Sequence, residues 1–361
     1  MGTKKADKSN LFGLYVHWPY CIHKCPYCDF ASTVCKTPDE PALLKAYIRD
    51  MECLPDNRPL TSLFFGGGTP SLMSTPFFEK LMSEIQKHYT FAKDIEISME
   101  VNPDTVDKNK LRTLKQMGIN RLSIGVQALN DKDLQFLGRT HSAKRAIECI
   151  YDAQEIFQNI NIDLIYARPH QSLKTWEKEL NQALQFNLPH YSLYQLTIEE
   201  NTVFEKKNQQ SASEIQARRL YQLTDDIMNA AHKPAYEVSN YALKGFECRH
   251  NMTYWLGQDY IGIGPAAHGR LGLQATTNER TVARWVQNKP HIEILTQNER
   301  DLEKLLMGLR LRQHAFPAKN LNPMKVQTAL KKGWITKNKQ GILPTQNGIL
   351  MLNQLILLLA D

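Results

Sequence analysis

The sequence lacks the features that mark membrane, secreted and low-complexity proteins. It contains no run of about 18 apolar residues that could span a bilayer, and no long low-complexity tract. Its N-terminal stretch MGTKKADKSN is polar and lysine-rich, and it leads into LFGLYVHWPY without the small-residue cleavage site of a secretory signal. We therefore expect a soluble, cytoplasmic protein in which residues 1–11 are disordered.

A concentrated basic surface is also absent. The formal net charge is +7, but lysine and arginine are spread along the chain and no basic patch is interleaved with aromatic residues. The charge has two interpretations: an ordinary solvated surface, or an aid in holding an anionic ligand such as a carboxylate-bearing small molecule. Neither requires a nucleic-acid partner, and we expect none.

Cysteine is scarce, but three of the seven cysteines are crowded together. Cys21, Cys25 and Cys28 lie within eight residues, whereas the others are scattered at Cys35, Cys53, Cys149 and Cys248. A chain of 361 residues can build its core without disulfides or structural metals. In a reducing compartment, an odd number of cysteines with this local crowding favours metal binding over disulfides.

The spacing C-x3-C-x2-C narrows the kind of metal. A structural zinc site needs four closed ligands, yet Phe30 stands where a fourth cysteine would follow Cys28. A [4Fe–4S] cluster held by three thiolates leaves one iron without a protein ligand, and a substrate or cofactor can bind there. Structural zinc and three unrelated thiols are the alternatives; the open triad favours the cluster.

From residue 14 to about 197, short apolar runs alternate with amphipathic stretches, as in the βα units of a parallel sheet. The six runs are LYVHW (14–18), SLFF (62–65), IEISMEV (95–101), RLSIGVQ (121–127), INIDLIY (160–166) and YSLYQLT (191–197). Residues with useful chemistry follow or close these runs, and barrel-like α/β folds gather their sites at the C-terminal ends of strands. We predict an α/β fold, a partial (β/α)6 TIM-type barrel of parallel strands at 12–200.

After residue 200 the apolar runs and amphipathic stretches no longer alternate regularly. We predict an α+β extension at 201–280, which contains CRHNMTYW and the strand-like run DYIGIGPAAHG. Residues 281–361 predict a winged-helix-like end, with helices, a hairpin at ITKNKQGILPT and a final helix ending NQLILLLA. Because no recognition helix there is notably basic, we interpret this end as a protein-contact or capping domain.

Seven motifs in order resemble one known superfamily. They are LYVHWPYCIHKCPYCDF, FFGGGTPSLM, EVNPDTVD, RLSIGVQALN, GRTH, NIDLIYARP and FECRHNMTYW. Together they are similar to the HemN/HemW group of the radical S-adenosylmethionine (SAM) superfamily, over nearly the whole chain from residue 12. The resemblance implies a [4Fe–4S] cluster on Cys21, Cys25 and Cys28, whose open iron chelates the amino and carboxylate groups of SAM.

The resemblance also implies SAM contacts. GGGTP resembles the family's glycine-rich SAM-binding strand end, which assigns Gly67, Gly68 and Thr69; alone, these glycines would indicate only a tight strand-to-helix turn. Tyr15, Tyr27 and Glu100 fall where the family contacts SAM. The alternatives are a shield over the cluster for Tyr27 and an ordinary cap or ion pair for Glu100.

A second SAM is a further implication. Gln127, Arg139 and Asp163 match the positions that hold a second SAM in the porphyrinogen-oxidising relatives. The alternative for Arg139 and Asp163 is a structural ion pair. Whether one or two SAM molecules bind, and whether SAM is cleaved in the working cycle, is left open.

Two branches of the group share this scaffold. One decarboxylates coproporphyrinogen III without oxygen; the other, the HemW branch, binds haem and passes it to acceptor proteins. Phe30 gives the CDF signature of the chaperone branch, and residues 250–255 fit its H-N-x-x-Y-W motif. Only 20 residues precede Cys21, whereas the oxidases carry a longer segment there. The resemblance therefore implies a haem chaperone, with the oxygen-independent oxidase as the alternative.

Haem needs basic groups for its propionates, an apolar wall and often an axial His or Cys. We take His250 as the candidate haem contact; the alternative is a hydrogen-bonded packing residue. His268 is a second candidate, although the equivalent region in relatives lies near SAM. The implied partners are haem and haem-accepting proteins, membrane-associated respiratory enzymes among them, with a homodimer left open. Radical modification of a nucleic acid or protein is a third class, supported only by the basic charge and the C-terminal end.

Overall fold

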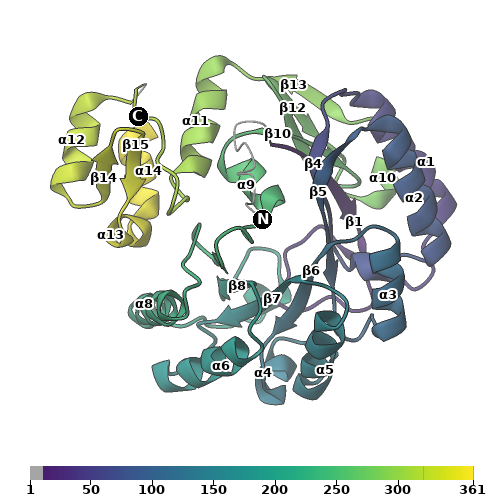
Figure 1. Ribbon diagram of the computed structural model, residues 1–361, viewed down its shortest axis with the longest axis horizontal. Coiled ribbons are helices and arrows are strands. Elements are labelled where there is room, and N and C mark those ends of the chain that lie inside the picture. Colours follow the sequence, from purple (N-terminus) through teal and green to yellow (C-terminus); the bar gives the residue numbers. More distant parts are fainter. Residues whose placement is uncertain (1–10, 320, 361) are drawn as a thin grey trace.

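The computed structural model describes residues 11–319 and 321–360. The predicted disordered segment 1–11 therefore lies, except for Leu11, outside the described residues. The largest element is an eleven-stranded sheet in the order β13-β12-β11-β10-β1-β4-β5-β6-β7-β8-β9. Figure 1 shows this sheet curving into an arc with helices along its outer side. Among the described strands, β13 and β9 form the two ends of the arc.

The six predicted parallel strands are confirmed. They are β1 (Phe12–Trp18), β4 (Leu60–Gly67), β5 (Phe91–Val101), β6 (Arg121–Gln127), β7 (Asn159–Tyr166) and β8 (His190–Gln195). Neighbours along this series pair in parallel. Most of their residues are buried because helices cover one face and the barrel interior lies on the other.

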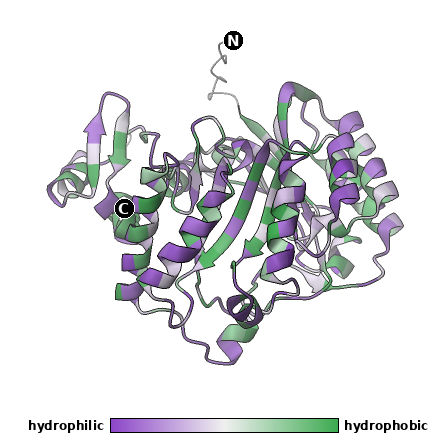
Figure 2. Ribbon diagram, turned by 60° about the horizontal axis from the view of Figure 1, so that its bottom comes forward, coloured by the Kyte–Doolittle hydropathy of each residue, from purple (hydrophilic) through white to green (hydrophobic). Residues whose placement is uncertain are grey.

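Helices connect these strands over the outer face. They are α1 (Glu40–Cys53), the short 3-10 helix η1 (Pro70–Leu72), α2 (Thr75–His88), α3 (Lys108–Gln116), α4 (Asp131–Phe136), α5 (Ala143–Gln154) and α6 (Leu173–Gln185). Ser74, Ser142 and Ser172 cap α2, α5 and α6 by accepting a hydrogen bond from a first-turn N–H. In Figure 2 the central strands are largely coloured as hydrophobic residues (green), while the surrounding helices carry many hydrophilic residues (purple).

The segment after residue 200 continues the same sheet. After α7 (Val203–Lys206) and α8 (Glu214–Ala230), β9 (Asn240–Ala242) pairs antiparallel with β8. At the other side, β10 (Asp259–Ile263) is a seventh parallel strand beside β1. The antiparallel strands β11 (His268–Leu271), β12 (Gln274–Thr277) and β13 (His291–Ile294) follow it, with α10 (Val282–Trp285) between the last two. The predicted divisions at residues 200 and 280 do not interrupt this sheet, and as domain boundaries they stay predictions.

Helix α9 (Arg249–Trp255) lies inside the arc of the sheet (Figure 1). It packs against β1, β4 and β10. Its His250 bonds to Ser62 near the start of β4 and approaches Gly13 near the start of β1. The helix therefore covers the end of the barrel where the strands begin, opposite the end where they finish.

The last residues form a smaller lobe with its own apolar core. It contains α11 (Gln297–Gly308), α12 (Pro323–Lys331), β14 (Ile335–Asn338), β15 (Gly341–Pro344), α13 (Gln346–Leu350) and α14 (Leu352–Ala360). The antiparallel pair β14–β15 is the predicted hairpin, which is confirmed. Within the described residues, no helix is long and apolar enough to cross a membrane.

Candidate functional site

One cavity of about 520 Å³ collects every residue selected for the cluster and for SAM, together with His250, the first haem candidate. Its wall includes Cys21, Cys25, Cys28, Tyr15, Tyr27, Gly67, Gly68, Thr69, Glu100, Gln127, Arg139, Asp163 and His250. These residues come from six strands or the loops after them and from α9, as expected when a barrel gathers its side chains at strand ends. His268 is not among the lining residues; it is exposed beside Thr277.

The cysteine loop follows β1 and is held at its base by two short strands. These are β2 (Tyr20–Cys21) and β3 (Thr33–Val34), which pair in parallel. The Lys24 ammonium donates to the carbonyl oxygens of Phe30 and Ser32, at 3.0 and 3.1 Å, across the loop. These bonds fix the loop over the cavity independently of any bound group.

The three thiols are free and face the same cavity. Burial, with smaller contributions from Cys25 and Cys21, raises the pKa of the Cys28 thiol to about 11. In the described part of the chain, no three His, Cys, Asp or Glu side chains are grouped to hold a single metal ion. The donor chemistry is that of three thiols without a fourth protein ligand, which fits a [4Fe–4S] cluster with one open iron better than a closed structural zinc site.

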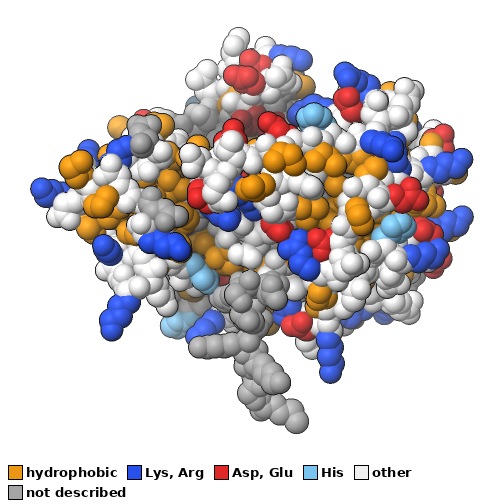
Figure 3. Space-filling view, turned by 90° about the horizontal axis from the view of Figure 1, so that it is seen from above, with side chains coloured by type: hydrophobic (Ala, Val, Ile, Leu, Met, Phe, Trp, Pro, Cys, Tyr) orange, Lys and Arg blue, Asp and Glu red, His pale blue; other side chains and the backbone are white. Residues whose placement is uncertain are grey.

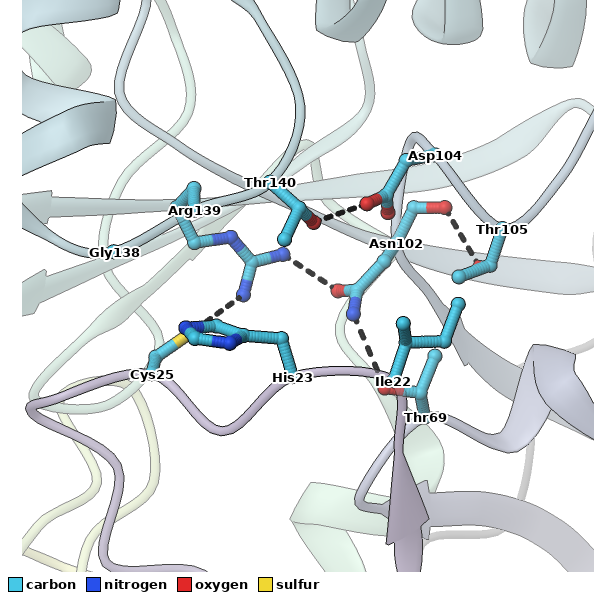
Figure 4. A pocket seen from close by; sticks show the side chains of 10 residues that line it. All are labelled: Ile22, His23, Cys25, Thr69, Asn102, Asp104, Thr105, Gly138, Arg139 and Thr140. Carbon is cyan, nitrogen blue, oxygen red and sulfur yellow. Dashed lines mark hydrogen bonds between the residues drawn. The ribbon is translucent and has the colours of Figure 1, made fainter. Parts of the chain in front are cut away.

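Arg139 joins the cysteine loop to the neighbouring strand ends (Figure 4). Its Nη1 donates to Cys25 Sγ at 3.4 Å, and its Nη2 donates to Asn102 Oδ1 at 2.7 Å and to the Gly125 carbonyl at 3.1 Å. Asn102 Nδ2 in turn donates to Thr69 Oγ1 at 3.1 Å. The ion pair considered for Arg139 and Asp163 is not formed, because each side chain is engaged with other partners.

The GGGTP turn is pressed against β1 and β2. Gly67 has φ +105°, and a Cβ there would lie 2.7 Å from the Trp18 carbonyl; one on Gly68 would lie 2.5 Å from the Tyr20 carbonyl. The N–H groups of Gly68 and Thr69 donate to those two carbonyls. The tight strand-to-helix turn is thus present, and a role toward SAM stays a prediction.

Two carboxyl groups, Glu100 of β5 and Asp163 of β7, face the cavity from strands on either side of β6. Burial, and then the nearby Asp163, raise the pKa of Glu100 to about 8, although Glu100 accepts a hydrogen bond from Gly67 N at 3.1 Å. Burial also raises the pKa of Asp163, which accepts from Asn161 Nδ2 at 2.7 Å and Ser123 Oγ at 3.3 Å. At neutral pH, Glu100 is therefore largely protonated.

Tyr15 is oriented by a chain of hydrogen bonds. Its hydroxyl lies 3.0 Å from His17 Nδ1, and His17 Nε2 lies 3.0 Å from the Ala31 carbonyl in the cysteine loop. Because a carbonyl only accepts, Nε2 carries the proton and Tyr15 donates to Nδ1.

Gln127, at the end of β6, has a strained backbone. Its φ is 67°, a conformation that costs energy for a non-glycine residue and that is frequent at functional sites.

His250 lies at the opposite, inner end of the cavity. Its Nδ1 is 3.0 Å from Ser62 Oγ and its Nε2 is 2.7 Å from the Tyr254 hydroxyl, and its ring stacks on Phe64. Burial lowers the pKa of His250 to about 3, so the imidazole is neutral. In this conformation His250 is a hydrogen-bonded packing residue, as the alternative to haem contact expected. Ligation of iron by Nε2 would require the Tyr254 hydroxyl to give up its hydrogen bond to that nitrogen.

The known proteins to which this chain is similar all indicate the same family. The radical SAM superfamily matches residues 15–183. The haem chaperone HemW of Buchnera aphidicola subsp. Schizaphis graminum is 33% identical over 96% of the chain and 98% of that protein. The HemW of Bacillus subtilis is 33% identical over 94% and 97%, and that of Escherichia coli K12 is 35% identical over 80% and 78%. The chain belongs to the HemW family.

A solved structure shows the fold of this HemW-family chain independently. The coproporphyrinogen III oxidase HemN of Escherichia coli, a radical SAM enzyme, superposes with a TM-score of 0.81 at 21% identity, covering 97% of this chain and 90% of HemN. The predicted membership of the HemN/HemW group and the partial-barrel fold are confirmed. At this identity, the likeness to HemN concerns the fold alone.

Part of the wall of this cavity was not predicted from the sequence. Residues not selected include Phe64, Arg121, Ser123, Ser192, Tyr194 and Asn251. Alternation along β6 could have found two of them, because Arg121, Ser123 and Gln127 share one face of that strand.

On the side of the molecule shown in Figure 3, Lys and Arg are spread among acidic and apolar side chains and do not form a basic patch.

Proposed function

We propose that this protein is a haem chaperone, which binds haem and transfers it to haem-dependent proteins. The observation that carries the proposal is 33–39% identity to haem chaperones named HemW. Phe30 at the cavity mouth and the HNMTYW segment of α9 at its inner end support it. We expect the exchange to occur in the cytoplasm, with membrane-associated respiratory enzymes among the acceptors.

Cys21, Cys25 and Cys28 would hold a [4Fe–4S] cluster. When bound, such a cluster supplies an open iron for SAM and a low-potential electron. Around it, Lys24 and Arg139 fix the loop that carries the thiols, and Gly67 and Gly68 leave room at the strand end. Membership of the radical SAM superfamily supports this assignment.

SAM would bind along the wall formed by Tyr15, Tyr27, Thr69 and Glu100. Protonated Glu100 can both donate to and accept from a ribose hydroxyl. Gln127 and Asp163 remain available for a second SAM. Arg139 is less available, because Cys25, Asn102 and Gly125 already occupy its guanidinium.

Haem would contact the inner part of the cavity through His250. The ring is neutral, which iron ligation requires, and a rotation of the Tyr254 hydroxyl frees Nε2. Phe64 and Tyr15 stack on each other and on the His250 ring, and together they offer an apolar wall.

Two anaerobic assays on cluster-reconstituted protein test the proposal. We expect haem to bind with a defined absorption spectrum, and coproporphyrinogen III to remain intact in the presence of SAM and a low-potential reductant. His250→Ala should change the haem spectrum, whereas the matched control His268→Ala, outside the cavity, should not. Decarboxylated product accumulating over many turnovers would assign the oxidase activity instead.

A further inference from the structure

Arg121 stands apart from the other buried arginines of the protein. It is only 2% exposed and it lines the cavity from the first position of β6. No carboxylate of residues 11–319 or 321–360 forms an ion pair with its guanidinium, and its Nε, like that of Arg168, has no hydrogen-bond partner. Arg168 and Arg300 are similarly buried, but Arg168 pairs with Glu179 and Asp133, and Arg300 with Glu303.

An unpaired buried arginine is costly to a fold. The guanidinium stays charged at all physiological pH values and carries five N–H donors. Removing that charge from water without a partner is strongly unfavourable, so a native protein retains such a group where something else meets it. Because Arg121 faces the cavity, the partner it lacks can arrive from the cavity.

The acids around Arg121 are engaged with other donors. Glu96 accepts from the backbone N–H groups at the start of α9, Glu100 accepts from Gly67 N, and Asp163 accepts from Asn161 and Ser123. Arg121 still interacts with Cys248, Glu96, Tyr236 and Asp163 through space. These through-space interactions moderate the charge of Arg121 but leave its Nε–H without a hydrogen-bond partner.

We propose that Arg121 is the anchor of a carboxylate-binding subsite at the inner end of the cavity. The proposal rests on the proposed haem binding, since a haem propionate is one source of that carboxylate. The other source is the amino-acid carboxylate of a SAM molecule that is not bound to the cluster. Proximity favours the propionate, because Arg121 is close enough to His250 to contribute to the lowered pKa of its imidazole.

Haem and its dimethyl ester form the first arm of the test, because they differ only in the two carboxylates. We expect wild type to bind haem about tenfold or more tightly than the diester. Arg121→Met should bring haem down to the affinity of the diester and leave the diester unchanged. Arg121→Lys keeps the positive charge but lacks the planar, paired N–H donors of a guanidinium, so it should retain part of the preference for haem over the diester. Arg218→Met on the exposed surface of α8 removes the same charge and should retain all of it.

Equilibrium dialysis of SAM against the same four proteins forms the second arm. Loss of one SAM per chain in Arg121→Met, with an unchanged haem preference, would assign the carboxylate to SAM. Retention of both the haem preference and the SAM stoichiometry in folded Arg121→Met and Arg121→Lys would overturn the subsite. If wild type binds neither haem nor the diester, the proposed chaperone function fails, while the SAM arm still tests Arg121.

Discussion

Glu96 links β5 to α9, the helix that carries the H-N-x-x-Y-W motif of the chaperone branch. Its carboxylate accepts from Arg249 N at 3.2 Å, from His250 N at 3.3 Å and from Cys248 Sγ at 3.5 Å. Arg249 and His250 are the first residues of α9, whose own N-cap residue makes no side-chain cap. A buried carboxylate from another element thus acts as the cap of this helix.

Replacing Glu96 should destabilise the protein measurably. Glu96→Ala removes all three bonds, and we expect a loss of about 2–4 kcal/mol in the free energy of unfolding. Glu96→Gln keeps one carbonyl acceptor, and about 1–2 kcal/mol is expected. Urea titration of the ligand-free proteins measures both losses, with Glu52→Ala on the exposed side of α1 as control. Haem affinity should fall in the same order, because His250 is positioned by this helix start.

The unfolding free energies of the two Glu96 variants separate the possible explanations. If Glu96→Ala unfolds within about 0.5 kcal/mol of wild type, as a surface substitution does, other contacts hold α9 and the capping account is wrong. Equal losses in the alanine and glutamine variants would likewise show that charge and shape, rather than accepted hydrogen bonds, set the energy.

Three further predictions concern the cavity. A Cβ on Gly138 (φ +68°) would lie 2.3 Å from Pro26 Cδ in the cysteine loop, so Gly138→Ala should lose iron on reconstitution, whereas Gly245→Ala, equally strained (φ +94°) but with open space, should not. The pKa of Glu100 rises from 4.5 to about 8 on folding, so the stability that it contributes falls as pH rises through that interval; Glu100→Gln should flatten this decline in urea titrations between pH 5 and 8, and an unchanged slope would refute the assignment. Arg139→Met should lower the reduction potential of the cluster, because the N–H donated to Cys25 Sγ stabilises added negative charge; redox titration followed by electron paramagnetic resonance would show no shift if that contact is incidental, with Arg218→Met on the exposed surface of α8 as control.

Much of the barrel was predictable because its signals are local. Apolar runs such as 121–127 and 160–166 are strands buried on both faces, and their helices begin at serine caps that the sequence displays. The cysteine triad was equally clear, since all three cysteines lie in one short loop. The selected site residues converge on one cavity because they occupy the ends of parallel strands.

Other features depend on long-range packing that no local pattern reports. The run at Asp259–Ile263 is strand-like, but only tertiary contacts make it a seventh parallel strand beside β1. The position of α9 inside the arc depends on Glu96, more than 150 residues away along the chain. Arg121 looked like an ordinary strand-start residue, because nothing in the sequence tells that its guanidinium lies unpaired in a cavity.

The central claim is that this HemW-family protein binds haem and transfers it to acceptor proteins. The most direct measurement incubates the haem-loaded, cluster-reconstituted protein with a haem-free acceptor enzyme, and follows both the donor spectrum and the recovery of acceptor activity. The account predicts that haem leaves the donor as acceptor activity appears, faster than from free haem at equal concentration. Haem retained on the donor, or activity no faster than with free haem, would contradict the account.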